Sequence, residues 1–168
     1  FLEYVAWQVE QQSALSDIKG ITYRQDGEIV ATADRDVMNL DQVVFPYGDI
    51  ENLHNRIVYY ETSRGCPFSC SYCLSSIDKT VRLRSLDKVY GELTFFLEQK
   101  VPQVKFVDRT FNCNHEHAYA IWKFVGEHDN GITNFHFEIS ADLLREEDLV
   151  LFKSFRPGLI QLEIGVQT

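Results

Sequence analysis

The chain has 168 residues, of which 45% are hydrophobic and 24% are charged, a composition typical of a globular chain that buries one core. Its net charge of -9 disfavours a nucleic-acid-binding surface, because such surfaces depend on clustered lysine and arginine. No apolar run approaches the roughly 20 residues of a membrane span, and no basic-then-apolar signal segment opens the chain, so we expect a cytoplasmic protein without membrane or nucleic-acid partners.

Residues 1–56 combine the patterns of a helix, a short hairpin and an irregular connector. The N-terminal helix is predicted from apolar residues that recur at helical spacing, Leu2, Val5, Ala6 and Val9. Asp26-Gly27 separates two β-rich stretches and predicts the turn of a hairpin, while the segment around Phe45-Pro46-Tyr47-Gly48 is typical of a connector. Because the chain opens inside a helix at Phe1 and ends just after a strand-like run, we interpret it as a piece of a longer protein.

A group of cysteines directly follows a β-rich run at Ile57–Tyr60, which we predict to be the first strand of the second part of the chain. Cys66, Cys70 and Cys73 have the spacing Cys-x3-Cys-x2-Cys, which brings their thiolates into one short loop. Soft thiolates clustered in this way suit an iron-sulfur cluster or zinc. A four-iron cluster with three protein thiolates leaves one iron open to another ligand, and that iron is where chemistry takes place.

Spacing alone leaves other uses of these cysteines open. A disulfide between such close neighbours is poorly placed, and zinc needs a fourth ligand, for which only Cys113 and remote histidines are present. A ferredoxin-like electron carrier uses four cysteines per cluster, commonly with a gap of two residues at the start, whereas the first gap here is three residues. An iron-sulfur cluster is therefore favoured over a zinc site or a disulfide.

From residue 85 onward, helix and strand patterns alternate. The predicted elements are a helix over 85–100, a strand over 104–108, a helix from Asn114 to Asn130-Gly131, a strand over 135–140, a helix over 146–155 and a strand over 159–166. This alternation predicts an α/β fold of parallel strands joined by right-handed crossovers. Because active sites of parallel α/β folds lie at the carboxyl ends of the strands, the cysteine loop is expected at that edge.

The third and fourth predicted strands each have one polar side. Glu138 and Glu163 each lie between two apolar neighbours, and the alternation continues along both strands. An enclosed parallel sheet is normally apolar on both sides, so a polar side indicates a cavity that holds a ligand. An antiparallel sheet with one face in water produces the same alternation, but the helices between these strands favour the cavity.

With Tyr72 included, the loop reads Cys-x3-Cys-x-aromatic-Cys, and it resembles the cluster-binding signature of the radical S-adenosylmethionine (radical SAM) enzymes. The resemblance implies a 4Fe-4S cluster held by Cys66, Cys70 and Cys73. It also implies that SAM chelates the open iron and is cleaved reductively to a 5'-deoxyadenosyl radical. Residues 57–168 would then be the N-terminal portion of a partial parallel (β/α) barrel, truncated after about four strands.

The resemblance also implies which side chains contact SAM. Tyr72 would lie beside the adenine, Glu138 would bind the ribose, and Glu163 would hold the methionyl or ribose end. Asp108 opens the stretch after the second strand, where the family often places a motif whose backbone receives the SAM amino group. That stretch reads Asp108-Arg109-Thr110-Phe111-Asn112 and not Gly-Gly-Glu, a form similar to the cobalamin-associated branch of the family.

In that branch, a cobalamin-binding domain precedes the barrel, and residues 1–56 resemble its tail and connector. Cobalamin is therefore expected only in the full-length protein. The resemblance implies an electron donor such as flavodoxin or ferredoxin and a substrate that the sequence does not identify. The open edge after the fourth strand predicts dimerisation of the fragment. The rival interpretation is a non-catalytic iron-sulfur module for electron transfer or scaffolding, and a zinc-binding interaction module is a third possibility.

Several other residues receive simpler interpretations. His115 and His117 are two positions apart on a predicted helix, so they point to different sides and make a poor metal-binding pair. Cys113 is interpreted as a partly buried thiol outside the cluster. Trp7 and Trp122 lie on apolar helix faces and are predicted to be core residues.

Overall fold

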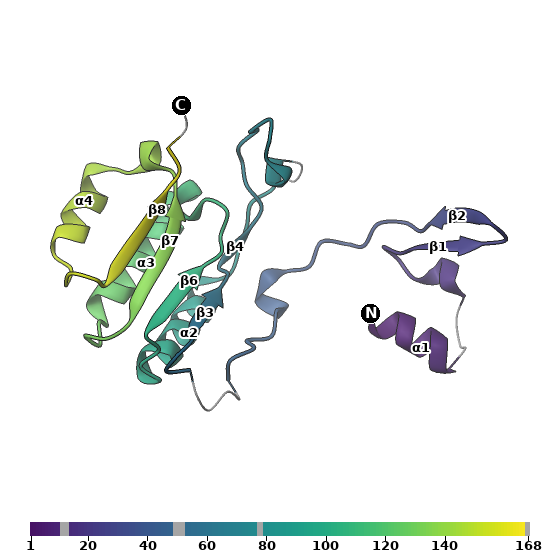
Figure 1. Cartoon of the computed structure of the whole chain (residues 1–168), viewed down its shortest axis with the longest axis horizontal. Coiled ribbons are helices and arrows are strands. Elements are labelled where there is room, and N and C mark those ends of the chain that lie inside the picture. The colour runs from purple at the N-terminus through teal and green to yellow at the C-terminus, as the bar shows by residue number, and fades with distance from the viewer. Residues whose placement is uncertain (11–13, 49–52, 77–78, 167–168) are drawn as a thin grey trace. The chain divides into compact units, whose positions relative to one another are not determined.

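The computed structural model describes residues 1–10, 14–48, 53–76 and 79–166 (Figure 1). Its internal contacts divide the chain into two units, residues 1–38 and residues 39–168, which are described separately. No helix within these described ranges has the length and apolar character needed to cross a bilayer.

The first unit contains a helix and a hairpin, as predicted. Helix α1 spans Leu2–Glu10, the short 3-10 helix η1 spans Leu15–Asp17, and strands β1 (Thr22–Gln25) and β2 (Glu28–Ala31) pair antiparallel. Asp26 and Gly27 form the turn with positive φ angles of 50° and 87°, a conformation that glycine and aspartate tolerate. No residue of α1 is buried, so the prediction that Trp7 is a core residue is wrong.

The second unit is built on a four-stranded parallel sheet in the order β3-β6-β7-β8 (Figure 1). The sheet strands are β3 (Ile57–Tyr60), β6 (Gln103–Phe106), β7 (Asn134–Ile139) and β8 (Ile160–Ile164), and β4 (Ser63–Arg64) and β5 (Arg82–Leu83) form a separate pair. The helices of the second unit are α2 (Leu86–Glu98), α3 (His115–Glu127) and α4 (Glu146–Lys153), with the 3-10 turns η2 (Leu40–Gln42), η3 (Leu74–Ser76), η4 (Phe111–Cys113) and η5 (Ala141–Leu143). The predicted parallel α/β fold is confirmed.

Local hydrogen bonds at the helix starts explain two of the predicted boundaries. The side chain of Asn114 accepts a hydrogen bond from the His117 amide and caps α3, as the sequence predicted. At the start of α4, the amide of Arg145 donates to Asp148 at 2.8 Å. Each contact gives an acceptor to a backbone amide at a helix start, where the amides have no partner within the helix.

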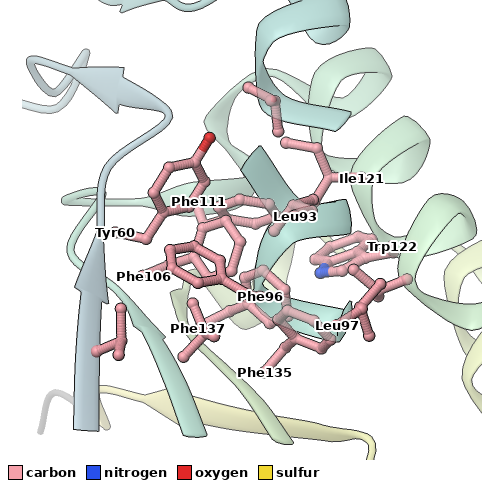
Figure 2. Close-up of a cluster of buried hydrophobic side chains, with 14 of the residues drawn as sticks. Tyr60, Leu93, Phe96, Leu97, Phe106, Phe111, Ile121, Trp122, Phe135 and Phe137 are labelled. Carbon is pink, nitrogen blue, oxygen red and sulfur yellow. The ribbon is translucent and has the colours of Figure 1, made fainter. Parts of the chain in front are cut away.

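Aromatic side chains fill the core between the sheet and helices α2 and α3 (Figure 2). Phe96, Phe106, Trp122 and Phe137 are fully buried, which confirms Trp122 as a core residue. The rings of Phe106 and Phe137 lie 4.4 Å apart between centroids. Burial of each such side chain contributes about 2–3 kcal/mol to folding, so this face of the sheet supplies most of the apolar stabilisation of the second unit.

A buried ion pair anchors the chain segment that precedes α2. Both terminal nitrogens of Arg84 lie 2.7 Å from the carboxylate of Glu92, and the hydroxyl of Tyr60 donates to the same carboxylate at 2.6 Å. The Arg84 and Glu92 side chains are only 6% and 11% exposed. Burial and the neighbouring carboxylate raise the pKa of Tyr60, so this tyrosine keeps its proton and remains a donor.

We predict that Glu92→Ala lowers the free energy of unfolding by about 3–5 kcal/mol, because it leaves the buried Arg84 guanidinium without its counter-charge. Urea unfolding followed by circular dichroism measures the change. The matched control is Lys123→Ala, which removes one partner of a pair whose side chains are both 58% exposed and should change stability by less than about 0.5 kcal/mol. Equal effects of the two substitutions would contradict the prediction.

Candidate functional site

A two-stranded clamp that the sequence analysis missed holds the base of the cysteine loop. Strands β4 and β5 pair antiparallel, with Ser63 opposite Leu83 and Arg64 opposite Arg82. The amide of Arg84 extends the clamp by donating to the carbonyl of Thr62 at 2.8 Å. Arg64 and Arg82, which flank the cysteine loop, therefore lie side by side. Each strand is two residues long, too short to produce a periodic pattern in the sequence.

Gly65 makes the sharp exit from this clamp possible. Its φ angle of 106° lies in the region that side-chain-bearing residues rarely adopt. A Cβ atom at this position would also collide with the carbonyl oxygen of Thr80. The two constraints together explain why glycine directly precedes Cys66.

A buried carboxylate joins this clamp to the neighbouring strand. Asp108 follows β6, is 1% exposed, and accepts hydrogen bonds from the Thr62 amide at 3.1 Å, the Thr62 hydroxyl at 2.7 Å and the Ser63 hydroxyl at 2.6 Å. Burial raises the pKa of Asp108, although these hydrogen bonds oppose the rise. The side chain is thus committed to holding the exit of β3, and a cofactor contact by the backbone after Asp108 stays a prediction.

The three loop cysteines form no disulfide within the described residues, and they differ in exposure. Cys66 is buried, Cys73 is half-buried and Cys70 is exposed. The amide of Cys73 donates to the Cys70 carbonyl at 3.1 Å, and the Cys66 sulfur lies 3.8 Å from the hydroxyl of Thr110. Within the part of the chain that the structure describes, no three metal-binding side chains are gathered at one point.

The donor chemistry of the loop nevertheless fits an iron-sulfur cluster. Three thiols in one clamped loop supply soft ligands for three irons, which leaves the fourth iron of such a cluster open to another ligand. Metal sites commonly complete their geometry only on binding, because the ligands have no other interaction that draws them together. Cys66, Cys70 and Cys73 would hold such a cluster.

Cys113 lies close to this loop but is suited to a different role. It belongs to η4 after β6, and its amide donates to the Thr110 carbonyl at 3.0 Å. Burial, reinforced by the neighbouring Cys66, raises the pKa of the Cys113 thiol. A thiol that retains its proton is a weak metal ligand, so Cys113 serves as a matched control for the loop cysteines.

The histidines at the start of α3 are engaged separately. His115 contacts the buried Asp148 at 2.9 Å, while burial lowers the pKa of His117. Within the described residues, the two rings are not part of a common group of metal-binding side chains.

A cavity of about 820 Å³ opens beside the clamp at the carboxyl edge of the sheet. This volume is within the range of small-molecule sites. Charged side chains make up half of its lining: Glu61, Arg64, Arg82, Lys105, Arg109 and Glu138, beside Tyr59, Ser63, Gly65, Leu74, Ser75 and Val107. The cavity therefore adjoins both the cysteine loop and the polar side of the strands.

The four residues predicted to contact SAM occupy different surroundings. Glu138 on β7 lines the cavity, and its register partner on β8 is Glu163, which ion-pairs with Lys105 at 3.0 Å. Tyr72 is 74% exposed on the cysteine loop and is not among the described residues that line the cavity. The structure brings Glu138, Glu163 and the loop base to one edge, and the SAM contacts themselves stay predictions.

Lys105 is the site residue that the sequence analysis passed over. Its Nζ lies 3.4 Å from Glu138 and 3.0 Å from Glu163. The available signal was a single lysine between two apolar residues of a predicted strand, Val104 and Phe106. The alternation that places Glu138 and Glu163 on the polar side of the sheet also places Lys105 there.

Comparison with known proteins identifies the class to which this fold and cysteine loop belong. The sequence profile of the Radical SAM superfamily matches residues 60–168, which is more than half of the chain. The chain therefore belongs to the radical SAM superfamily.

Two curated relatives match the chain, and each match covers only a minor part of the relative's own length. An uncharacterized methyltransferase of Pyrococcus horikoshii is 30% identical over 119 residues, covering 64% of this chain and 26% of the relative. The anaerobic magnesium-protoporphyrin IX monomethyl ester cyclase of Rubrivivax gelatinosus is 26% identical over 174 residues, covering 95% of this chain and 31% of the relative. The chain thus spans about a third or less of each relative.

A solved structure shows the same fold. The radical SAM methyltransferase TsrM of Kitasatospora setae, with tryptophan substrate and a SAM analogue bound, superposes with a TM-score of 0.68 at 16% identity. The match covers 98% of this chain and 35% of TsrM. A second TsrM structure, with cobalamin and a 4Fe-4S cluster bound, gives a TM-score of 0.55 at 19% identity and covers 65% of this chain and 22% of TsrM.

We predict that replacing Cys66, Cys70 or Cys73 singly with Ala abolishes a stable four-iron cluster, whereas Cys113→Ala leaves it intact. Two thiolates cannot replace three, and the protonated Cys113 thiol is a poor substitute. Iron and sulfide analysis after anaerobic reconstitution provides the measurement. A loss in the Cys113 variant equal to that in the loop variants would overturn the ligand assignment.

We also predict that Asp108→Ala lowers the free energy of unfolding by at least about 2 kcal/mol, because it leaves the buried Thr62 and Ser63 donors without an acceptor. The folded state raises the pKa of Asp108, so the stability contributed by this group is fully present below its unfolded pKa and falls as pH rises through the folded one. The loss should therefore be larger at pH 4 than at pH 7 in urea unfolding.

The control for Asp108 is Glu127→Ala, which removes an acidic side chain that is 58% exposed. Its effect should stay below about 0.5 kcal/mol. A loss for Asp108→Ala that grows toward neutral pH would show that the hydrogen bonds to the carboxylate outweigh its burial.

Proposed function

We propose that this chain binds a 4Fe-4S cluster through Cys66, Cys70 and Cys73 and binds SAM in the adjoining cavity, as part of an enzyme that cleaves SAM reductively. The observation that carries the proposal is the clamped cysteine loop at the carboxyl edge of a parallel sheet, next to a cavity lined by Glu138. When bound, the cluster would supply the electron for homolytic cleavage of SAM to a 5'-deoxyadenosyl radical. An electron donor such as flavodoxin or ferredoxin would reduce it.

The residues predicted to contact SAM have separate tasks in this proposal. Glu138 would accept hydrogen bonds from the ribose hydroxyls, since a carboxylate has only acceptor atoms. Tyr72 would reach the adenine from the cysteine loop, and the backbone after Asp108 would receive the amino group. The clamp would hold the loop so that the open iron faces the cavity.

The reaction after SAM cleavage is proposed as radical methyl transfer or another radical modification. The methyltransferase name of the relative from Pyrococcus horikoshii supports the first, and the cyclase name of the relative from Rubrivivax gelatinosus supports the second. Cobalamin is proposed for the whole protein only, on the sequence resemblance of residues 1–56 to a cobalamin-domain tail, and a TsrM structure contains it.

Electron paramagnetic resonance of the reduced cluster tests the proposal. After anaerobic reconstitution, addition of SAM should change the g values of the cluster signal, because SAM binds directly to an iron. The Cys113→Ala variant should respond in the same way, and Cys70→Ala should show no four-iron signal. A reduced four-iron signal that SAM leaves unchanged would instead support a non-catalytic electron-transfer or scaffold module.

A further inference from the structure

The polar side of the sheet is arranged in layers. At the amino end of the strands, the Gln103 amide donates to Asn134 at 3.1 Å and to Gln161 at 3.4 Å, so three neutral side chains from β6, β7 and β8 form one hydrogen-bonded row. Asn134 in turn donates to the Gly158 carbonyl at 2.8 Å. Amide groups paired in this way are satisfied by one another and need no ligand.

A charged layer follows one step nearer the cysteine loop. Lys105 is the register partner of His136, and Glu138 is the register partner of Glu163. The Lys105 ammonium lies between the two carboxylates, 3.4 Å from Glu138 and 3.0 Å from Glu163. Like charges directly opposite each other on neighbouring strands repel, and the ammonium between them offsets that repulsion.

The carboxylates of Glu138 and Glu163 differ in the number and length of their ion-pair contacts. One oxygen of Glu163 lies within 3.0 Å of both Lys105 and the ring of His136. Glu138 lines the cavity, and within the described residues its ion pairs are limited to the longer contact with Lys105. Glu163 therefore has the closer contacts within the layer, and Glu138 is the carboxylate that lines the cavity.

We propose that Lys105 is the positioning residue of the SAM site: held by Glu163, it fixes the Glu138 carboxylate in the orientation that contacts the ligand. Lys105 does not itself touch SAM in this proposal, and Glu163 acts through Lys105. The inference rests on the proposed function, because it assigns Lys105 to the site in which Glu138 binds SAM.

The charges around Glu163 set the expected pH dependence. It faces Lys105 from β6 and His136 and Glu138 from β7. The Lys105 ammonium holds the pKa of Glu163 below its usual range, with a smaller contribution from His136. Removal of the ammonium should therefore move the Glu163 titration to higher pH, while His136 preserves part of the effect.

The test compares Lys105→Met, which keeps length and removes charge, with Lys105→Arg, which keeps the charge. SAM affinity of the reconstituted protein is measured by calorimetric titration, and the Glu163 carboxyl is titrated by nuclear magnetic resonance without SAM. Lys105→Met should weaken SAM binding about tenfold, because Glu138 then loses the ammonium that orients it and its charge-assisted contact to SAM is lost, and it should move the Glu163 titration upward. Lys105→Arg should retain most of the affinity, and Lys123→Met, whose side chain is exposed on the outer side of α3, should behave as the unmodified protein.

Glu163→Gln is the second variant, because it removes the carboxylate that holds Lys105 and leaves Lys105 and Glu138 in place. It should weaken SAM binding several-fold with unchanged iron content. If the unmodified protein binds SAM and Lys105→Met binds it equally well, the role of Lys105 is overturned while the proposed function stands. If the unmodified, cluster-loaded protein binds no SAM, both the proposed function and this inference are overturned.

Discussion

The carboxylate of Asp108 accepts hydrogen bonds from Thr62 and Ser63, and this contact ties the exit of β6 to the exit of β3. Ser63 begins the two-stranded clamp, so the position of the clamp follows from the position of Asp108. The cysteine loop then starts at a fixed point beside the cavity. A buried carboxylate is costly unless its oxygens accept hydrogen bonds. This cost explains why Thr62 and Ser63, the two residues in contact with Asp108, both carry hydroxyl donors.

The two faces of the sheet have different roles: one packs the apolar core, and the other carries the polar groups of the candidate site. Aromatic side chains such as Phe106 and Phe137 fill the face covered by α2 and α3 (Figure 2), and this packing holds the strands in register. The opposite face carries the amide row and the charged layer around Lys105. Successive residues of a strand point to opposite faces, so one short strand contributes side chains both to the core and to the polar face. Charged groups lie on the face that does not pack against the core.

Sequence patterns predicted the fold well because the elements are periodic and separated by clear signals. The N-cap at Asn114 and the alternation around Glu138 led to the correct helix and the correct polar face. The β4–β5 clamp escaped prediction because pairing between such short strands depends on the tertiary contact to Asp108. Lys105 was missed for a related reason: its significance comes from two glutamates on other strands, and sequence periodicity does not reveal which charges meet across a sheet.

Mössbauer spectroscopy of the iron-57-loaded protein tests the central claim, that three loop thiolates hold a cluster with one iron open to SAM, most directly. Addition of SAM should change the isomer shift of one iron among the four and leave the three thiolate-bound irons unchanged. A spectrum in which SAM changes none of the irons, or in which all four are equivalent before and after its addition, would contradict the account.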